Sequence, residues 1–312
     1  MTLAVGVLAG CGDDEDDAAR SQGRVTVRVG ILPIADSAPL YLGMKQGFFA
    51  DEDLEVKPQL VASGAIAIPA VVRGEFQFGW TNSTSLIIAR SRGLPLRFVS
   101  GGSVGGSGPA EGSSAIFVSN GGPITSAKQL EGKTISVPAL NSISTLTANA
   151  ALEKRGVDIS TVKYIEVPFP QAIAALERGR VDAAFVAEPF ITLGMRAGHR
   201  IVSHPISETA RDYAAAAFFT TDEYIAEHGD VVERFARAVN RSLDYAIAHP
   251  AQVRAVLPTY TEVPPRIAQA MRLSEFSRGL DETSLQLTVD LAKKYGYIKR
   301  TPRISELVHE PS

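Results

Sequence analysis

The sequence predicts an α/β protein built from two similar lobes. Short apolar stretches typical of strands alternate with helical stretches along most of the chain, which is the pattern of a parallel sheet covered by helices. A strand–loop–helix unit also occurs twice, 105 positions apart. The length of 312 residues is enough for one large or two medium hydrophobic cores. Two facing α/β lobes enclose a cleft, and such clefts bind small molecules.

The repeat is visible in two pairs of segments. In each copy, an apolar helical stretch is followed by Arg-Gly and a short strand, and a second strand ends in a proline-containing loop. Gly74 of the first copy then aligns with Gly179 of the second copy. The matched pairs are AIAIPAVVRGEFQFGW (65–80) with PQAIAALERGRVDAAF (170–185), and VGILPIADS (29–37) with TISVPALNS (134–142).

Each element of the first lobe has its own local signal. A first helix opens with Pro39 in its first turn, a second starts after Ser63-Gly64, and a third follows a turn at Asn82-Ser83. The second helix ends at Arg73-Gly74, where glycine suits the helix C-cap. Strands are predicted where apolar and β-branched residues run together, at 25–32, 54–61, 76–81 and 96–102.

The second lobe extends from about residue 120 to residue 213. A short helix comes first, and a later helix has Asn141, Ser142 or Ser144 at its N-cap. Another helix is expected at 171–179, and strands are expected at 134–138, 163–168, 181–189 and 199–205. Two further strands, 114–120 and 214–220, should cross between the lobes. The Gly/Ser-rich stretch 101–114 before the first crossing is either a flap over the cleft or a plain linker.

A helical tail should pack on the first lobe. Its strongest helix, 230–249, carries one apolar stripe, and Asp230 and Glu233 have the spacing of a capping box. The stripe consists of Val232, Phe235, Val239, Leu243 and Ala246. The predicted domains are therefore a leader and tether at 1–23, lobe 1 at 24–116 plus 217–312, and lobe 2 at 117–216.

The N-terminal segment has a different character from the rest. Residues 1–23 contain five acidic residues and one arginine, so the remainder carries a net charge of +1, which argues against nucleic acid as a partner. Cys11, the single cysteine, follows Leu-Ala-Gly in a segment that resembles the lipobox of bacterial lipoproteins. Residues 1–10 lack the Lys or Arg that opens a signal peptide, so the start is expected to be truncated. The alternative is a chance cysteine.

Four segments together resemble the solute-binding proteins of bacterial ABC importers, most closely the nitrate/sulfonate/taurine and NMT1/THI5-like group. They are VRVGILPIADSAPLYLGMKQGFF, SGAIAIPAVVRGEFQFGW, AKQLEGKTISVP and ALERGRVDAAFVAEPF. The resemblance implies a type II periplasmic-binding-protein fold, with two α/β lobes joined by two crossover strands around a ligand cleft. It also implies an extracytoplasmic, lipid-anchored monomer without cofactor or metal. Its partners would be a small-molecule ligand and the permease and ATPase of an importer.

Candidate ligand-binding residues lie where strands end, because ligands of α/β sheets bind beyond the carboxyl ends of the strands. These ends carry small or polar side chains. The candidates are Pro33, Asp36, Ser37, Ala38, Ser63, Gly64, Trp80, Asn82, Ser83, Gly102, Asn141, Ser142, Ser144, Glu188 and Phe190.

The expected ligand is a small organic anion such as an aliphatic sulfonate, taurine or nitrate. The helix starts after Ser37 and Asn141 present free backbone N–H groups, and Ser142 and Ser144 add hydroxyl donors. Plain helix capping is the alternative role for Asn141 and Ser142. The expected mechanism is closure of the lobes around the ligand, and the closed form is presented to a permease.

Two acidic residues leave a second ligand class open. Asp36 and Glu188 would repel an anion, so the ligand could instead carry an amine or a ring nitrogen, as taurine, a pyrimidine, a thiamine precursor or another aromatic compound would. Asp36 could also cap the first helix, and Glu188 could be structural. Trp80 is either a core residue or an apolar wall of the pocket.

The sequence offers little catalytic chemistry. It has no His/Cys cluster with metal-ligand spacing, no G-x-S-x-G elbow and no P-loop, and its five histidines are expected away from the cleft. Enzymes that resemble this fold and make the thiamine pyrimidine carry a Cys-rich motif, which this chain lacks. We therefore expect a binding protein, with a cytoplasmic enzyme or a sensory lipoprotein as alternatives.

Overall fold

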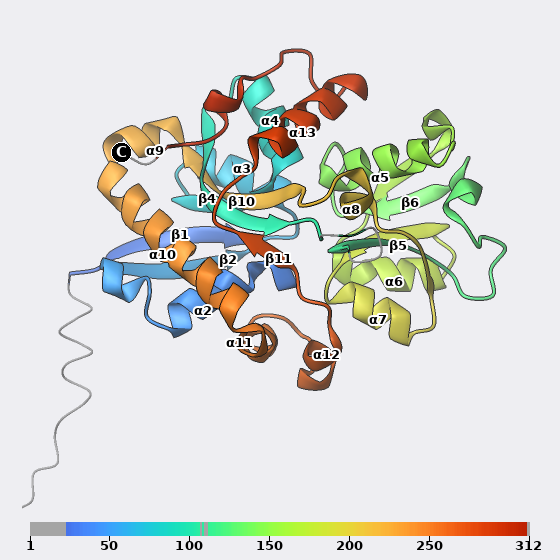
Figure 1. Ribbon diagram of the computed structural model, residues 1–312, viewed down its shortest axis with the longest axis horizontal. Coiled ribbons are helices and arrows are strands. Elements are labelled where there is room, and N and C mark those ends of the chain that lie inside the picture. Colours follow the sequence, from blue (N-terminus) through green and yellow to red (C-terminus); the bar gives the residue numbers. More distant parts are fainter. Residues whose placement is uncertain (1–22, 107, 109–111, 311–312) are drawn as a thin grey trace, which may run out of the picture.

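The computed structural model describes residues 23–106, 108 and 112–310, and it forms two α/β lobes side by side (Figure 1). Cys11 and most of the acidic tether lie outside the described residues. The first sheet has the order β11 (Glu275–Ser277), β4 (Leu96–Val104), β10 (Ala214–Thr221), β3 (Phe78–Asn82), β1 (Val25–Ile31), β2 (Leu54–Leu60). The second has the order β7 (Lys163–Glu166), β6 (Thr134–Val137), β8 (Ala183–Ala187), β5 (Ser114–Val118), β9 (Arg200–Ser203). The predicted fold class is confirmed.

Helices cover both sheets. The α-helices are α2 (Ala38–Lys45), α3 (Gly64–Val72), α4 (Ser83–Ser91), α5 (Ile143–Lys154), α6 (Phe169–Glu177), α7 (Phe190–Arg196), α8 (Pro205–Thr209), α9 (Asp222–Glu227), α10 (Gly229–Ala248), α11 (Pro250–Val256), α12 (Pro265–Ala270) and α13 (Glu282–Lys294). Single 3₁₀ turns are η1 (Ala35–Ser37), η2 (Ala50–Glu52), η3 (Ala127–Leu130), η4 (Ile159–Thr161), η5 (Leu257–Thr259) and η6 (Ile304–Glu306). Within the described part of the chain, no helix has the length and hydrophobicity of a membrane span.

The internal repeat is confirmed, and two pairs of its elements match to the residue. Helices α3 and α6 start at Gly64 and Phe169, strands β3 and β8 start at Phe78 and Ala183, and all bounds differ by 105. Helix α5 likewise starts 105 positions after α2. Just beyond α3 and α6, Gly74 and Gly179 have φ angles of 71° and 65°, a left-handed conformation that glycine adopts without a Cβ penalty.

Two antiparallel strands carry the chain between the lobes. The chain leaves the first lobe after β4 and returns into β10, and these strands pair with Ala217 opposite Gly102. Beyond the pair, Gly105 N donates to Tyr213 O at 2.7 Å. The prediction that 114–120 and 214–220 cross between the lobes is wrong for the strands themselves, because β5 pairs with β8 and β9 inside the second lobe and β10 pairs with β3 and β4 inside the first. The exact division of the chain at residues 116 and 216 stays a prediction.

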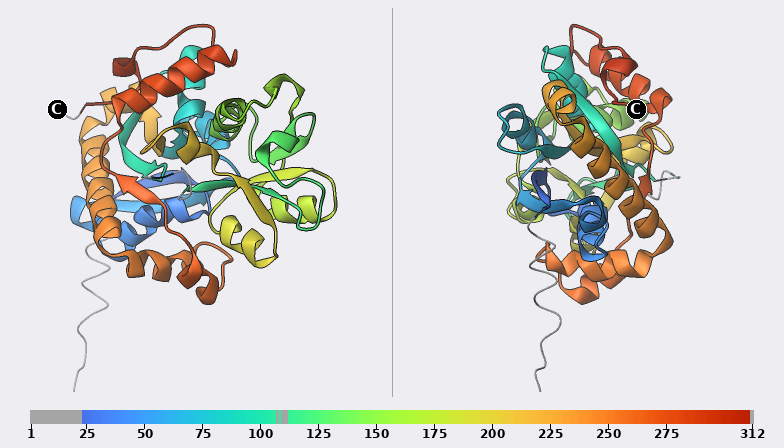
Figure 2. Two further views of the ribbon diagram at one scale, coloured as in Figure 1. Left: turned by 45° about the vertical axis from the view of Figure 1, so that its right-hand side comes forward. Right: turned by 90° about the vertical axis from the view of Figure 1, so that its left-hand side faces the viewer.

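The long helix α10 lies across the outer face of the first lobe (Figures 1 and 2). Its predicted apolar stripe is buried, and the Phe235 ring stacks on the Phe78 ring of β3 at 3.8 Å. The predicted capping box is wrong. The N-cap is His228, and the Asp230 carboxylate instead accepts a hydrogen bond from Arg234, one turn later.

Close packing of α10 on α2 depends on Gly43. A Cβ at this position would meet the Ser242 hydroxyl and would lie 2.8 Å from the Phe49 ring. We expect Gly43→Ala to lower the free energy of unfolding by about 1–3 kcal/mol, because overpacking outweighs the roughly 1 kcal/mol by which alanine favours a helix. Urea unfolding measures this. Gly229→Ala is the control, since its Cβ meets nothing within 4 Å. A Gly43→Ala variant at least as stable as the unmodified protein would contradict the packing argument.

Candidate ligand-binding site

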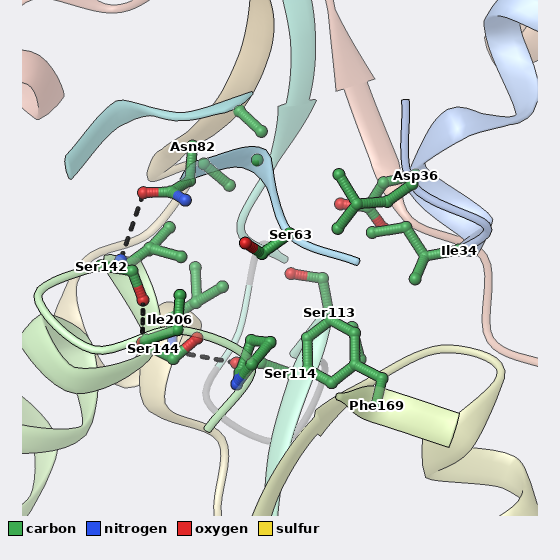
Figure 3. A pocket seen from close by; sticks show the side chains of 18 of the residues that line it. Ile34, Asp36, Ser63, Asn82, Ser113, Ser114, Ser142, Ser144, Phe169 and Ile206 are labelled. Atoms are coloured by element: carbon green, nitrogen blue, oxygen red, sulfur yellow. Dashed lines mark hydrogen bonds between the residues drawn. The ribbon is translucent and has the colours of Figure 1, made fainter. Parts of the chain in front are cut away.

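A cavity lies between the two lobes, where strand ends and helix starts of both sheets meet (Figure 3). Its volume is about 590 Å³, including the mouth that opens to solvent. Its walls are mostly apolar, with several serine hydroxyl groups and one carboxylate. The lining residues are Leu32, Ile34, Asp36, Ser63, Gly64, Trp80, Asn82, Ser113, Ser114, Pro138, Ala139, Ser142, Ile143, Ser144, Phe169, Phe185, Ala187, Ile206, Ala215 and Ala216.

The structure brings several of the predicted site residues together around this cavity. One comes from the turn η1 that follows β1, two from β3, two from the start of α3, and two from the start of α5. They are Asp36, Trp80, Asn82, Ser63, Gly64, Ser142 and Ser144. Trp80 is 5% exposed, so it is at once a core residue and a wall of the pocket. Their role in binding stays a prediction.

Other candidates do not line the cavity. The Ser37 hydroxyl donates to Leu32 O at 2.6 Å, and Ala38 is buried in a hydrophobic cluster with α11 and α12. Ser83 is buried in the first turn of α4, Pro33 lies between two lining residues, and Gly102 is paired inside β4. These candidates therefore belong to the elements next to the cavity and do not line it.

The remaining candidates belong to the second lobe. Asn141 is exposed with φ 48°, and Ser142, not Asn141, is the N-cap of α5. Glu188 is 3% exposed and points into the protein, where its carboxylate accepts hydrogen bonds from the Thr192 N–H and hydroxyl at 2.9 and 2.8 Å. Phe190 stacks on Phe169 at 6.1 Å, one layer behind the cavity wall.

Several lining residues were missed in the sequence. The repeat contained a signal for three of them, because Phe169, Phe185 and Ala187 lie 105 positions after Gly64, Trp80 and Asn82. Ser113 and Ser114 come from the Gly/Ser-rich stretch, whose residues 107 and 109–111 lie outside the described part.

One expectation about the histidines is wrong. The ring of His204 bonds to the carbonyl oxygen of Ser114 at 2.8 Å, so this histidine lies directly behind the cavity wall. It supports the segment that carries the Ser113 and Ser114 side chains.

Four α-helices begin at the cavity, namely α3, α4, α5 and α6. Backbone N–H groups at a helix start lack intrahelical acceptors and favour negative charge. At α5 one of them is already paired, because Ile143 N donates to Asn82 Oδ1 at 3.2 Å across the cleft. Nearby, the Ser113 hydroxyl has no hydrogen-bond partner among the described residues. This part of the cavity therefore offers donors to a ligand oxygen.

Asp36 is the one charged side chain among the described residues that line the cavity. Its carboxylate accepts a hydrogen bond from Ser274, so the predicted capping of the first helix is wrong. Burial raises the pKa of Asp36, and the Ser274 hydrogen bond opposes that rise. Burial also raises the pKa of Glu188, and the neighbouring charge of Asp36 adds to the rise.

The arrangement can hold a small molecule by donors at one end and a carboxyl group at the other. Figure 3 shows Asp36 on the opposite side of the pocket from Asn82, Ser142 and Ser144. Among the described residues, no three His, Cys, Asp or Glu side chains are grouped as metal ligands.

A family model described as NMT1/THI5 like matches residues 34–253, which is most of the chain and includes most of the cavity lining. The chain belongs to the NMT1/THI5-like family. The resemblance inferred from the sequence is thereby confirmed.

Curated relatives are more distant. The riboflavin-binding protein RibY of Chloroflexus aurantiacus and the taurine-binding periplasmic protein of Escherichia coli are each 26% identical to this chain. The matches cover 73% and 70% of this chain but only 63% of each relative. A Candida albicans relative named 4-amino-5-hydroxymethyl-2-methylpyrimidine phosphate synthase is 23% identical over 77% of this chain and 71% of its own length. The relatives of this chain thus include proteins named for binding and a protein named for synthesis.

A solved structure shares the fold. The alkanesulfonate-binding protein SsuA from Xanthomonas axonopodis pv. citri superposes with a TM-score of 0.75 at 17% identity, over 91% of this chain and 98% of that one.

The buried Asp36 should make stability depend on pH. Its pKa is raised in the folded state, so its contribution to stability is complete below about pH 4 and is lost as the pH rises through the folded-state pKa. Asp36→Asn removes this loss of stability and keeps an acceptor for Ser274.

For Asp36→Asn we expect Tm to rise by about 2–4 °C at pH 8, the shift that roughly 1 kcal/mol gives in a large domain, and not to rise near pH 4. Thermal unfolding across this range tests it. Asp290→Asn, which removes a carboxylate on the exposed surface of α13, is the matched control. Parallel profiles for Asp36→Asn and the unmodified protein would contradict the argument.

Proposed function

We propose that this protein is the solute-binding component of an ABC importer and that it captures a small organic ligand between its lobes. The supporting observation is the cavity itself, which is built from helix starts and hydroxyl groups of both lobes. Family membership agrees with this role, and so do relatives that are named as binding proteins. The partners would be a membrane permease and its ATPase.

The ligand that fits the cavity best has an acceptor group at one end and an amine at the other. A sulfonate or carboxylate would accept hydrogen bonds near the starts of α3 and α5 and from the Ser63 and Ser113 hydroxyls, which point into the cavity. Lysine and arginine are absent from the described lining, so helix starts and hydroxyls supply the donors. An ammonium group would pair with Asp36 and bring the pKa of this carboxyl back down. Small ω-amino sulfonates such as taurine have this chemistry.

A flat nitrogen-containing ring is the second candidate. Trp80, Phe169 and Phe185 give the cavity three aromatic lining residues, which suit a pyrimidine or a larger aromatic ring. A ring N–H could donate to Asp36 in the place of an amine.

We further propose an extracytoplasmic location with a lipid anchor at Cys11. The support is the Leu-Ala-Gly-Cys sequence followed by the acidic run 13–17. Metabolic labelling with a fatty-acid analogue, in the unmodified protein and in Cys11→Ser, tests the anchor.

Titration calorimetry with taurine and ethanesulfonate tests the proposed ligand class. We expect taurine to bind at least tenfold more tightly, because only taurine carries an amine for Asp36. Asp36→Asn should weaken taurine binding by about tenfold to a hundredfold, the range expected for losing a charged hydrogen bond, and should not weaken ethanesulfonate binding. Asp290→Asn is the matched control, because it removes a carboxylate on the surface of α13.

The alternatives give different results in the same assay. Binding of a pyrimidine but of neither sulfonate would favour the second candidate. If taurine and ethanesulfonate bind equally and Asp36→Asn changes neither affinity, Asp36 does not recognise an amine. Turnover of a pyrimidine precursor instead of binding would overturn the solute-binding function.

A further inference from the structure

We infer that Asn82 is a latch that holds the two lobes in the closed arrangement by capping one helix in each lobe. Asn82 ends β3 of the first lobe and is the N-cap of α4. Its side-chain oxygen accepts a hydrogen bond from Ser85 N at 2.9 Å in the same lobe. The same oxygen accepts a second hydrogen bond from Ile143 N at 3.2 Å in the opposite lobe. One oxygen atom thus joins the starts of two helices.

The second bond exists only when the lobes are together. Ile143 is the first residue of α5, and its N–H has no acceptor inside its own helix. Ser142, the N-cap residue, does not serve it, because the Ser142 side-chain oxygen accepts from the backbone N–H of Thr145, two residues further into the helix. Opening the cleft would leave the Ile143 N–H to water or to a ligand oxygen. Closure and ligand binding therefore draw on the same donor.

A related contact on the other lobe supports this interpretation. Ala35 N, at the start of η1 in the first lobe, donates to Glu188 O in the second lobe at 3.0 Å. Glu188 directly follows β8, which is the repeat equivalent of β3, and η1 leads into α2, the equivalent of α5. Each lobe thus offers an acceptor at the end of the corresponding strand, on its last residue in β3 and one residue beyond it in β8, to a helical start of its partner. The acceptor at Glu188 is a backbone oxygen, so Asn82 is the member of the pair that a substitution can remove.

The net value of one hydrogen bond predicts the size of the effect. Removing the cross-lobe bond should lower the ratio of closed to open molecules by about twofold to tenfold. Asn82→Asp should preserve or raise this ratio, because a carboxylate accepts the same two bonds and its charge is favourable at two helix starts. The inference concerns the lobes alone and does not depend on the ligand class proposed above.

The test measures the distance between the lobes without ligand. Spin labels at Lys57→Cys and Arg178→Cys, two exposed sites in different lobes, are placed in the full chain with Cys11→Ser. Double electron–electron resonance then gives the populations of short and long distances. Asn82→Ala should shift the population towards the long distance by the factor above, and Asn82→Asp should not.

A matched control separates the latch from ordinary capping. Thr221→Ala removes the side chain that caps α9 by accepting from Tyr224 N at 3.0 Å, a contact inside the first lobe. Both alanine variants lose the side-chain cap of one helix in the first lobe, so both should lower Tm, but only Asn82→Ala also loses the bond to α5 and should change the distance distribution. The same distribution in Asn82→Ala, Thr221→Ala and the parent would overturn the inference. A parent protein that shows the long distance alone would also overturn it.

Discussion

Backbone N–H groups at helix starts need acceptors, and this need constrains how the two lobes face each other. Four α-helices begin at the cavity, and each leaves donors that its own hydrogen-bond ladder cannot satisfy. Two hydrogen bonds across the cleft satisfy N–H groups at helical starts. Ile143 N donates to the Asn82 side-chain oxygen, and Ala35 N, at the start of η1, donates to the Glu188 carbonyl oxygen. Donors that stay unpaired where the protein shields them from water are costly, so a ligand oxygen that reaches them is bound favourably. The same backbone N–H groups can thus bond across the closed cleft or donate to a ligand oxygen.

The electrostatics of the pocket follow from this arrangement. Among the described lining residues, no lysine or arginine supplies positive charge, and helix starts with serine hydroxyls take that role. Asp36 runs against the pattern, because a carboxyl group is buried there at a free-energy cost that Ser274 only partly offsets. A buried residue that lowers the stability of the folded protein is a good candidate for ligand recognition.

The sequence was most informative where local pattern and repeat agreed. The 105-residue offset predicted that α3 corresponds to α6 and β3 to β8, because a repeated unit buries the same face in each copy. The tail after α10 was less predictable: α12 and α13 find their places through long-range packing, which leaves only a weak local signal. Several strand ends do line the cavity, but the side chains of Glu188 and Asn141 do not. Their directions depend on the neighbours Thr192 and Arg272 for Glu188, and on the left-handed backbone for Asn141.

The two copies of the repeat share a framework but supply different chemistry. Where the first lobe places Gly64 and Asn82, the second places Phe169 and Ala187 at the equivalent positions. Asp36 lines the cavity, whereas its equivalent Asn141 is exposed. Two identical lobes would present a ligand with the same groups from both sides and could not define its direction. The difference between the copies gives the cavity an apolar wall and distinct polar ends. A cavity of this kind can hold an asymmetric ligand in one direction only.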